Sequence, residues 1–294
     1  MFDSPSALPQ VLPLQQHQNF AAALTAYGQP PLMLSEPDTL LVIRRRFAGS
    51  VPLAMISRGQ VGKDGLEQIK AALGSTPVIL SPGSRCEMLP RSGAVPLMTP
   101  ATLAEIDLTL SESQRHARLY PKWRNRLTKA QNGPLRVSHC SMPVDPGHWL
   151  LRAEALQQSR RSYRGWPTAL TLAYAMENKA QTRLFTAYLR GHPGAAMLFL
   201  LHGDGATYHI GHTDDDGRRL SAHTLLLWSA MVWLAQKGHT RLDLGLLDTR
   251  NAPGLARFKL GSGATLRRLG GTWLYWSLAR RFLAPLAALD QRRM

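Results

Sequence analysis

The sequence has few cysteines and no long apolar segment. Its 294 residues include only Cys86 and Cys140, which form neither a C-x-x-C pair nor the spacing of a zinc site. We therefore expect reduced thiols in a cytoplasmic protein. No apolar run reaches the ~18 residues that a membrane span needs. No basic segment followed by an apolar one stands at the N-terminus, so no secretion signal is predicted.

Acidic residues are also scarce. There are 19 Asp and Glu against 35 Lys and Arg, which gives a formal net charge of +16. Such an excess favours anionic partners such as nucleic acid, phosphate-rich cofactors or an anionic membrane surface. A basic, solvated surface without a specific partner explains the same charge, and both interpretations stay open.

Several catalytic and metal-binding motifs are missing. No Ser-His-Asp arrangement, G-x-S-x-G or phosphate-binding G-x-x-x-x-G-K-S/T is present. His209 and His212 lie three apart on a predicted strand, where alternation places them on opposite faces, so they are not expected to share an ion. The acidic run at 214–216 lacks the alternation and closing Glu of a calcium loop and is expected to form a solvated turn. No metal site is predicted.

Residues 205–269 show the clearest pattern of alternating strands and helices. A strand at 206–213 precedes an apolar helix at 222–236, which Ser221 should cap and Gly238 should end. A strand at 241–247 places three leucines on one face. A short helix then begins at Pro253 and ends at Gly261, before a further strand. This order predicts a helix that crosses over an open sheet.

The rest of the chain is predicted in less detail. Helices are expected at 16–27, 63–73, 148–161 and 167–178, and on both sides of Pro121 within 111–131, where Ser111 and Gln114 form a capping box. Strands are expected at 38–46, 51–59, 77–81, 135–141, 182–190 and 195–202, and a loop at 84–99. The aromatic and basic tail at 273–293 predicts a docked terminal helix or a peripheral contact with an anionic membrane.

Four short segments carry a family resemblance. They are Tyr208-x-x-Gly211, the helix end Ala235-Gln236-Lys237-Gly238, Asp243-Leu244-Gly245, and residues 254–261 with the sequence GLARFKLG. In this order and spacing they resemble the C-terminal half of FemAB-type acyltransferases, which belong to the GNAT-like N-acyltransferase superfamily. Residues 123–130 resemble a further segment of that family. The resemblance implies an α/β protein with tandem GNAT-like halves, 1–145 and 146–294, whose mixed sheets are flanked by helices.

The implied activity is transfer of an acyl group to an amine, and three residues are candidates for it. Lys259 borders the apolar face of its helix, and the matching Phe-Lys motif of FemX-like members implies that it lies at the active site. Asp243 is a candidate base or orienter of the amine, or the partner of a nearby arginine. Tyr208 is a candidate proton donor to a leaving thiolate, or a core residue.

A second set of residues is expected to hold phosphates. Arg218 and Arg219 precede Ser221 at the N-terminus of the buried helix, where anions bind, and Arg124 and Lys129 lie on a basic helix. The coenzyme A signature of typical GNAT enzymes is replaced at 217–222 by GRRLSA, which leaves the donor open between an acyl-CoA and an aminoacyl-tRNA. The lack of an inserted coiled-coil arm favours the thioester.

The acceptor is expected to be a small-molecule or peptide amine, and tRNA is a possible partner. A different function also fits the sequence, namely a catalytically silent GNAT-like module that binds RNA or an anionic membrane. The salt dependence of binding separates the two, because contacts to a nucleic-acid backbone weaken steeply as salt rises.

Overall fold

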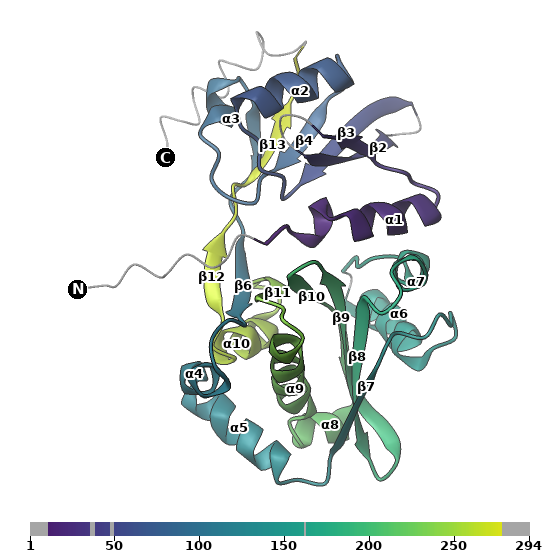
Figure 1. Ribbon diagram of the computed structural model, residues 1–294, viewed down its shortest axis with the longest axis vertical. Coiled ribbons are helices and arrows are strands. Elements are labelled where there is room, and N and C mark those ends of the chain that lie inside the picture. Colours follow the sequence, from purple (N-terminus) through teal and green to yellow (C-terminus); the bar gives the residue numbers. More distant parts are fainter. Residues whose placement is uncertain (1–10, 36–38, 48–49, 162, 278–294) are drawn as a thin grey trace, which may run out of the picture. The chain divides into compact units, whose positions relative to one another are not determined.

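The computed structural model describes residues 11–35, 39–47, 50–161 and 163–277 (Figure 1). It confirms the predicted α/β class, with one six-stranded and one seven-stranded mixed sheet flanked by helices. The chain forms two compact units. Unit 1 comprises residues 1–14 and 103–266, and unit 2 comprises residues 15–102 and 267–294.

The six-stranded sheet of unit 2 has the order β1-β2-β3-β4-β13-β5. Its elements are α1 (Gln18–Ala26), β1 (Leu32–Leu34), β2 (Leu40–Phe47), β3 (Val51–Ser57), α2 (Lys63–Leu73), β4 (Val78–Ser81), α3 (Met88–Arg91), β5 (Val95–Met98) and β13 (Thr272–Tyr275). The apolar residues of α2, which has the predicted bounds, pack on this sheet through Leu66 and Ile69.

Two predictions for unit 2 were wrong. Residues 84–99 contain α3 and β5 rather than a loop. The first part of the C-terminal tail is strand β13, which inserts between β4 and β5 and pairs Trp273 with Leu80. Trp273 and Tyr275 pack against the core of this unit, so these two rings are not available to a membrane. The remainder of the predicted tail, 278–293, lies outside the described residues.

The seven-stranded sheet has the order β12-β6-β11-β10-β9-β8-β7. Its strands are β6 (Thr102–Asp107), β7 (Arg136–Cys140), β8 (Thr182–Leu189), β9 (His192–His202), β10 (Gly205–Thr213), β11 (Arg241–Leu246) and β12 (Thr265–Arg268). The helices are α4 (Glu112–Arg118), α5 (Pro121–Gln131), α6 (Trp149–Arg161), α7 (Thr168–Glu177), α8 (Asp215–Arg219), α9 (Ala222–Gln236) and α10 (Pro253–Gly261). The capping box at Ser111 and the helix start at Pro121 are both confirmed.

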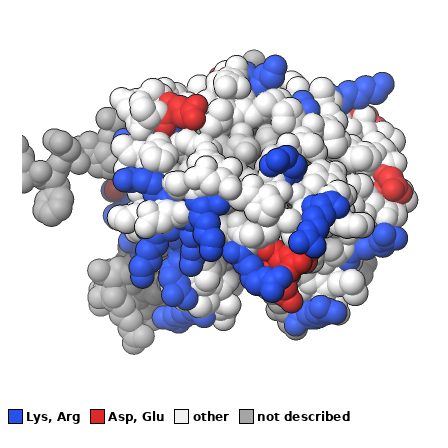
Figure 2. Space-filling model, turned by 90° about the horizontal axis from the view of Figure 1, so that it is seen from below, with Lys and Arg blue, Asp and Glu red and all other residues white. Residues whose placement is uncertain are grey.

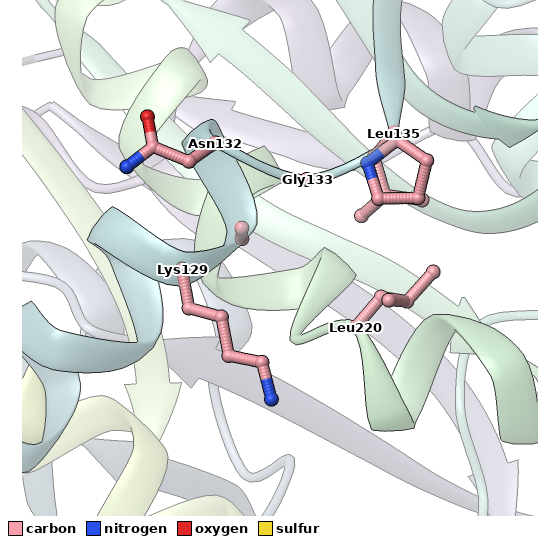
Figure 3. A pocket seen from close by; sticks show the side chains of 7 residues that line it. Lys129, Asn132, Gly133, Leu135 and Leu220 are labelled. Atoms are coloured by element: carbon pink, nitrogen blue, oxygen red, sulfur yellow. The ribbon is translucent and has the colours of Figure 1, made fainter.

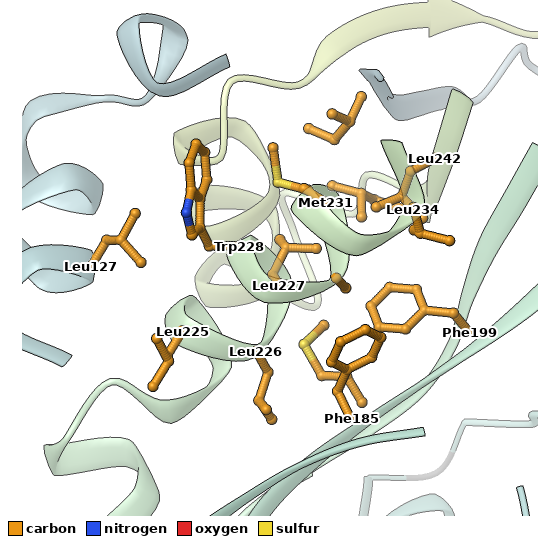
Figure 4. Close-up of a cluster of buried hydrophobic side chains, with 14 of the residues drawn as sticks. Leu127, Phe185, Phe199, Leu225, Leu226, Leu227, Trp228, Met231, Leu234 and Leu242 are labelled. Atoms are coloured by element: carbon orange, nitrogen blue, oxygen red, sulfur yellow. The ribbon is translucent and has the colours of Figure 1, made fainter. Parts of the chain in front are cut away.

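Helix α9 is the predicted crossover between the parallel strands β10 and β11. One face of the sheet packs against α9 and α5, with Phe185, Phe199 and Leu226 in the shared core (Figure 4). The opposite face packs against α6 and α7 through Leu150, Leu198 and other apolar residues. Because it lies between the sheet and α5, α9 is apolar almost all round.

The start of α9 and the strand after it differ from prediction. Ser221 occupies the N-cap position with φ +58°, in the left-handed region, and its side chain makes no capping hydrogen bond. The acidic run forms helix α8, which Asp214 caps by accepting a 2.7 Å hydrogen bond from the Gly217 amide. In β11 the leucine alternation ends at Gly245, whose φ of +81° interrupts the strand geometry, and Leu246 is 52% exposed.

The compact units do not follow the predicted division at residue 145. Residues 103–145 pack with the C-terminal part of the chain, because β6 pairs with β11, β7 pairs with β8, and α5 packs on α9. Strand β6 was not predicted at all. Among the described residues, no helix combines the length and apolar character needed to cross a membrane.

Candidate functional site

The parallel strands β10 and β11 separate partway along their length. Their pairing covers three positions and ends with Thr207 opposite Asp243, although β10 continues to Thr213. A register shift between Tyr208 and Ile210 marks a bulge on the other edge of β10. In open α/β sheets, ligands bind beyond the carboxyl ends of parallel strands. The side chains around this divergence are therefore the candidate site.

Lys259 reaches the end of β11 from helix α10. Its side chain is 5% exposed, and its Nζ donates a 2.8 Å hydrogen bond to the main-chain oxygen of Leu246. A β-carbon at Gly245 would lie 3.6 Å from this nitrogen, so the glycine turn passes close to it. Burial lowers the pKa of Lys259 to about 8, and the nearby Asp243 carboxylate opposes that shift. The Lys259 ammonium therefore loses its proton at a lower pH than an ordinary lysine does.

Asp243 organises the same turn. Its side chain is 6% exposed, and Oδ1 accepts a 2.6 Å hydrogen bond from the Gly245 amide. That bond fixes the residue with positive φ against which Lys259 lies. The structure therefore brings two of the predicted catalytic residues together, a buried carboxylate and a buried ammonium.

Tyr208 follows the last residue of β10 that pairs with β11. A β-carbon at Gly211 would overlap its hydroxyl group, so the bare backbone of Gly211 makes room for the phenol. Its ring centroid lies 5.8 Å from that of Phe199. Burial first, and then the nearby Glu154 and Tyr163, raise the pKa of Tyr208 well above its ordinary value. At neutral pH this phenol is protonated.

Glu154 is a candidate site residue that sequence reasoning missed, because its charge acts on Tyr208. Its Oε1 accepts hydrogen bonds from the Tyr163 hydroxyl at 2.8 Å and from Gln158 at 3.0 Å. Gln157 in turn donates to the Tyr163 oxygen at 2.9 Å. Glu, Gln and Gln at 154, 157 and 158 share one face of α6, a spacing visible in the sequence. Their meeting with Tyr163 depends on the loop after α6 and was not predictable.

The bulge in β10 also changes the environment of the two histidines. Both contact the helices on one face of the sheet: His209 hydrogen-bonds Thr171 of α7 at 2.9 Å, and the His212 ring lies 6.1 Å from that of Trp149 of α6. The prediction that they face opposite ways was wrong, because the bulge shifts the alternation. Burial lowers the pKa of His209 to about 4, so it is neutral. Among the described residues, no three candidate ligands gather into a metal site.

The predicted phosphate-binding residues fall into two groups, and the first lies at the α8–α9 junction. Arg218 and Arg219 are exposed on α8, where they form ion pairs with Asp215 at 2.8 Å and with Asp216. Because these pairs are solvated, they hold the guanidinium groups weakly.

Lys129 lies near the same junction. It lines a pocket of ≈ 330 Å³ together with Asn132, Gly133, Leu135 and Leu220, the residue after Arg219 (Figure 3). In the close-up the Lys129 side chain extends from α5 beside the pocket, while Leu220 faces Leu135. Lys and Arg side chains cover more of the face shown in Figure 2 than acidic side chains do.

Arg124 has a different environment from Lys129, although both lie on α5. Its guanidinium donates 3.1 Å hydrogen bonds to the main-chain oxygens of Ala117 and Leu119, at the C-terminal end of α4. These contacts satisfy carbonyl groups that a helix end leaves without partners. They give Arg124 a role in joining α4 to α5.

The comparisons with known proteins agree with this architecture. A family model described as an acetyltransferase (GNAT) domain matches residues 121–260. The chain is similar to the crystal structure of FemX, with 12% identity, a TM-score of 0.74 and coverage of 96% of this chain and 95% of that one. Among curated proteins, none matches the sequence significantly.

Two further solved structures share the fold. One is the C-terminal domain of a putative lysylphosphatidylglycerol synthetase from Agrobacterium fabrum, with 15% identity, a TM-score of 0.59 and coverage of 94% and 92%. The other is L-PGS from Bacillus licheniformis, with 13% identity, a TM-score of 0.55 and coverage of 96% and 99%. The chain therefore has a FemAB-type, GNAT-like acyltransferase fold.

Proposed function

We propose that the protein is an N-acyltransferase that moves an acyl group from an acyl-CoA-type donor to an amine. One observation carries the proposal. On an acyltransferase fold, Lys259 holds a buried ammonium with a pKa of about 8 where the parallel strands β10 and β11 have separated. A positive charge of low solvation is suited to stabilise the oxyanion that forms in acyl transfer.

The candidate residues supply the charges and protons that the reaction needs. The acceptor amine attacks the carbonyl carbon, a C–N bond forms, and the carbonyl oxygen gains the negative charge that Lys259 stabilises. As the tetrahedral intermediate collapses, the C–S bond breaks and the Tyr208 phenol protonates the leaving thiolate. The acceptor loses two protons between its ammonium form and the amide, one before it attacks and one from the tetrahedral intermediate. Asp243 and Glu154 are the carboxylates available to accept them or to pass them to water, and Tyr208 is then reprotonated.

Binding of the donor is assigned to the α8–α9 junction. Lys129 lines the pocket beside Leu220, and the pairs of Arg218 and Arg219 with Asp215 and Asp216 are exposed enough to exchange for phosphate oxygens. Ser221, at the start of α9, adds main-chain donors at a helix N-terminus. Because Arg124 bonds the end of α4, we assign it to support of this region instead of the phosphate contact expected from the sequence.

An aminoacyl-tRNA is the alternative donor. The likeness to FemX extends over 96% of this chain and supports it, since the resemblance to FemX-like proteins implies aminoacyl transfer. The same residues serve, except that a C–O bond breaks and Tyr208 protonates a ribose oxygen. The large excess of basic residues, +16 overall, suits a nucleic-acid donor as well as coenzyme A.

Donor binding and transfer test the proposal together. Thermal unfolding is followed with acetyl-CoA, a long-chain acyl-CoA, and charged and uncharged tRNA, at low and moderate salt. The ligand that gives a saturable shift is then offered with radiolabelled acyl groups and a panel of amines. We expect label transfer by Lys259→Met to be about 100- to 1,000-fold slower than by the natural chain, with equal thermal shifts for both proteins. No shift with any donor would overturn the proposal and favour a catalytically silent module.

A further inference from the structure

A second pocket lies on the surface of unit 1 beside the C-terminal half of α9. It has a volume of ≈ 420 Å³, and aromatic rings from three elements line it: His139 of β7, Phe185 of β8, and Trp228 and Trp233 of α9. Glu112, Ser229 and Gln236 add polar groups to its lining. We call this the aromatic pocket. The proposed acyl-transfer chemistry uses none of these residues.

The rings of His139, Phe185 and Trp233 pack against one another. Phe185 and Trp228 are 1% and 5% exposed. The Trp233 ring stands at 75° to that of Phe185, with 6.2 Å between centroids. His139 on the edge strand lies 5.2 Å from Phe185 and 5.6 Å from Trp233. Rings held by the core lose little conformational entropy when a flat ligand stacks on them.

Two cations lie near the Trp233 ring. The Arg183 guanidinium carbon lies 4.4 Å and the Lys237 ammonium 5.9 Å from the Trp233 ring centroid. Burial lowers the pKa of His139, and Arg183 and Lys237 lower it further, so its imidazole is neutral at pH 7. The Nε of Arg183 is buried without a hydrogen-bond partner among the described residues. The pocket therefore offers a neutral imidazole and apolar rings beside two cations at Trp233, with the Glu112 carboxylate also in its lining.

This combination excludes some ligands and favours one class. A cationic ligand would be repelled by Arg183 and Lys237. An alkyl chain would bury Glu112 and Gln236 without satisfying them. A planar heterocycle can stack its faces on the aromatic rings and form hydrogen bonds from its edge to the polar side chains. A phosphate attached to the heterocycle can pair with Arg183 and Lys237.

We propose that the aromatic pocket binds one nucleotide unit, with the base against His139 and Trp233 and the phosphate toward Arg183 and Lys237. A free mononucleotide and an unpaired nucleotide of an RNA strand share this chemistry. The binding activity is separate from acyl transfer and holds whether or not the protein transfers acyl groups.

Tryptophan fluorescence of the full chain measures binding of AMP, with ribose 5-phosphate as the control that lacks a base. Fluorescence anisotropy measures binding of an unpaired, labelled oligoadenylate of about ten nucleotides, because such surfaces cover about 4–16 nucleotides. We expect saturable quenching by AMP and none by ribose 5-phosphate. Saturation by the oligonucleotide at lower concentration than by AMP would identify RNA as the source. Saturation by AMP at the lower concentration would identify a free nucleotide.

Matched variants locate the site. Ser229→Glu places a carboxylate inside the pocket. Ser138→Glu places the same charge on the opposite face of strand β7, since Val137 and His139 are the pocket-facing positions there. Ser229→Glu and Arg183→Gln should each weaken binding at least about tenfold, because each changes one charge that acts on the phosphate. Ser138→Glu should change the affinity less than about twofold. Unchanged thermal unfolding confirms that each variant is folded.

The proposal fails if neither AMP nor the oligonucleotide saturates. It also fails if ribose 5-phosphate binds as well as AMP, or if Ser138→Glu weakens binding as much as Ser229→Glu. The last result would indicate general attraction to a basic surface, which high salt removes.

Discussion

Nζ of Lys259 donates a hydrogen bond to the main-chain oxygen of Leu246 at 2.8 Å. The bond joins helix α10 to the end of strand β11, just beyond the Gly245 turn that Asp243 holds. A single main-chain acceptor and one neighbouring carboxylate compensate only part of the cost of burying an ammonium, which is why its pKa falls to about 8. Burial of this ammonium therefore costs the folded state free energy.

The stability of the protein should therefore depend on pH through Lys259. Its pKa is about 8 when folded, against the ordinary value of 10.5, so between these values the unfolded chain binds more protons. Stability relative to Lys259→Met should be lowest below pH 8 and rise toward pH 10, by on the order of 1–3 kcal/mol. Urea unfolding of both proteins at pH 7 and pH 10 measures the difference. If the free energies of unfolding of the two proteins change equally with pH, the pKa of Lys259 is the same in the folded and unfolded chains.

The rate of acyl transfer should fall where stability rises with pH, because both depend on the proton of Lys259. Because the ammonium is the form that stabilises an oxyanion, single-turnover rates with saturating donor and amine should fall as pH rises through about 8. Lys259→Met should lose about 100- to 1,000-fold in rate. Lys259→Arg, whose charge persists at high pH, should keep part of the rate and lose the fall above pH 8. Retention of the fall in Lys259→Arg would assign the titration to another group.

The elements that the sequence predicted well are those with local signals. Helix α9 has its predicted bounds because apolar residues fill it and Gly238 ends it, and α10 lies between Pro253 and Gly261 as expected. Strands β5 and β13 were missed because each is stabilised by the other: Thr272 pairs with Met98, far away in the sequence. Short strands without alternation carry no signal of their own.

The candidate site shows the same limit. The sequence offered Lys259 and Asp243 as separate catalytic candidates, and the structure places the Asp243 carboxylate near the Lys259 ammonium. The bulge after Tyr208 could not be predicted, and it moved His209 to the face of α7. Arg124 and Lys129 belong to the same basic helix, yet one bonds the end of α4 and the other lines a pocket. A row of basic residues on a predicted helix does not indicate which side chains hydrogen-bond within the protein and which remain available to a ligand.

Arg124 and Lys129 should consequently differ when mutated. Arg124→Gln removes hydrogen bonds to Ala117 and Leu119 and should cost about 1–3 kcal/mol of stability, with little change in donor affinity. Lys129→Ala should leave stability within about 0.5 kcal/mol and weaken donor binding several-fold. Chemical unfolding and donor titration of both variants measure the contrast. Equal loss of donor affinity in the two would return Arg124 to the phosphate site.

Gly211 should be required for the position of Tyr208. The β-carbon of Gly211→Ala would overlap the Tyr208 hydroxyl, so the phenol must rotate away. We expect the transfer rate to fall by about 100-fold or more, within the range for loss of a proton donor, while donor affinity is kept. Tyr208→Phe is the reference, because it removes the hydroxyl without moving the ring. If Gly211→Ala is far more active than Tyr208→Phe, the bare backbone of Gly211 is not required to place the phenol, and if Tyr208→Phe is itself fully active, the phenol is not the proton donor.

Glu154 should act on the amine side of the reaction. Hydrogen bonds from Tyr163 and Gln158 hold its carboxylate, and its charge raises the pKa of Tyr208. Glu154→Gln keeps the shape but removes the charge that attracts an ammonium. We therefore expect the KM for the amine to rise about tenfold, equivalent to about 1.4 kcal/mol, with donor affinity unchanged. Glu177→Gln, an exposed charge change at the end of α7, is the matched control.

The pH dependence separates recognition from proton transfer by Glu154. If the carboxylate only binds the acceptor, saturating amine should restore the rate of Glu154→Gln at every pH, because the kcat step is unaffected. If it accepts a proton, kcat should stay low even at saturation and should recover as pH rises and the free amine becomes abundant. A variant that matches Glu177→Gln in both KM and kcat would remove Glu154 from the site and leave Asp243 as the carboxylate of the reaction.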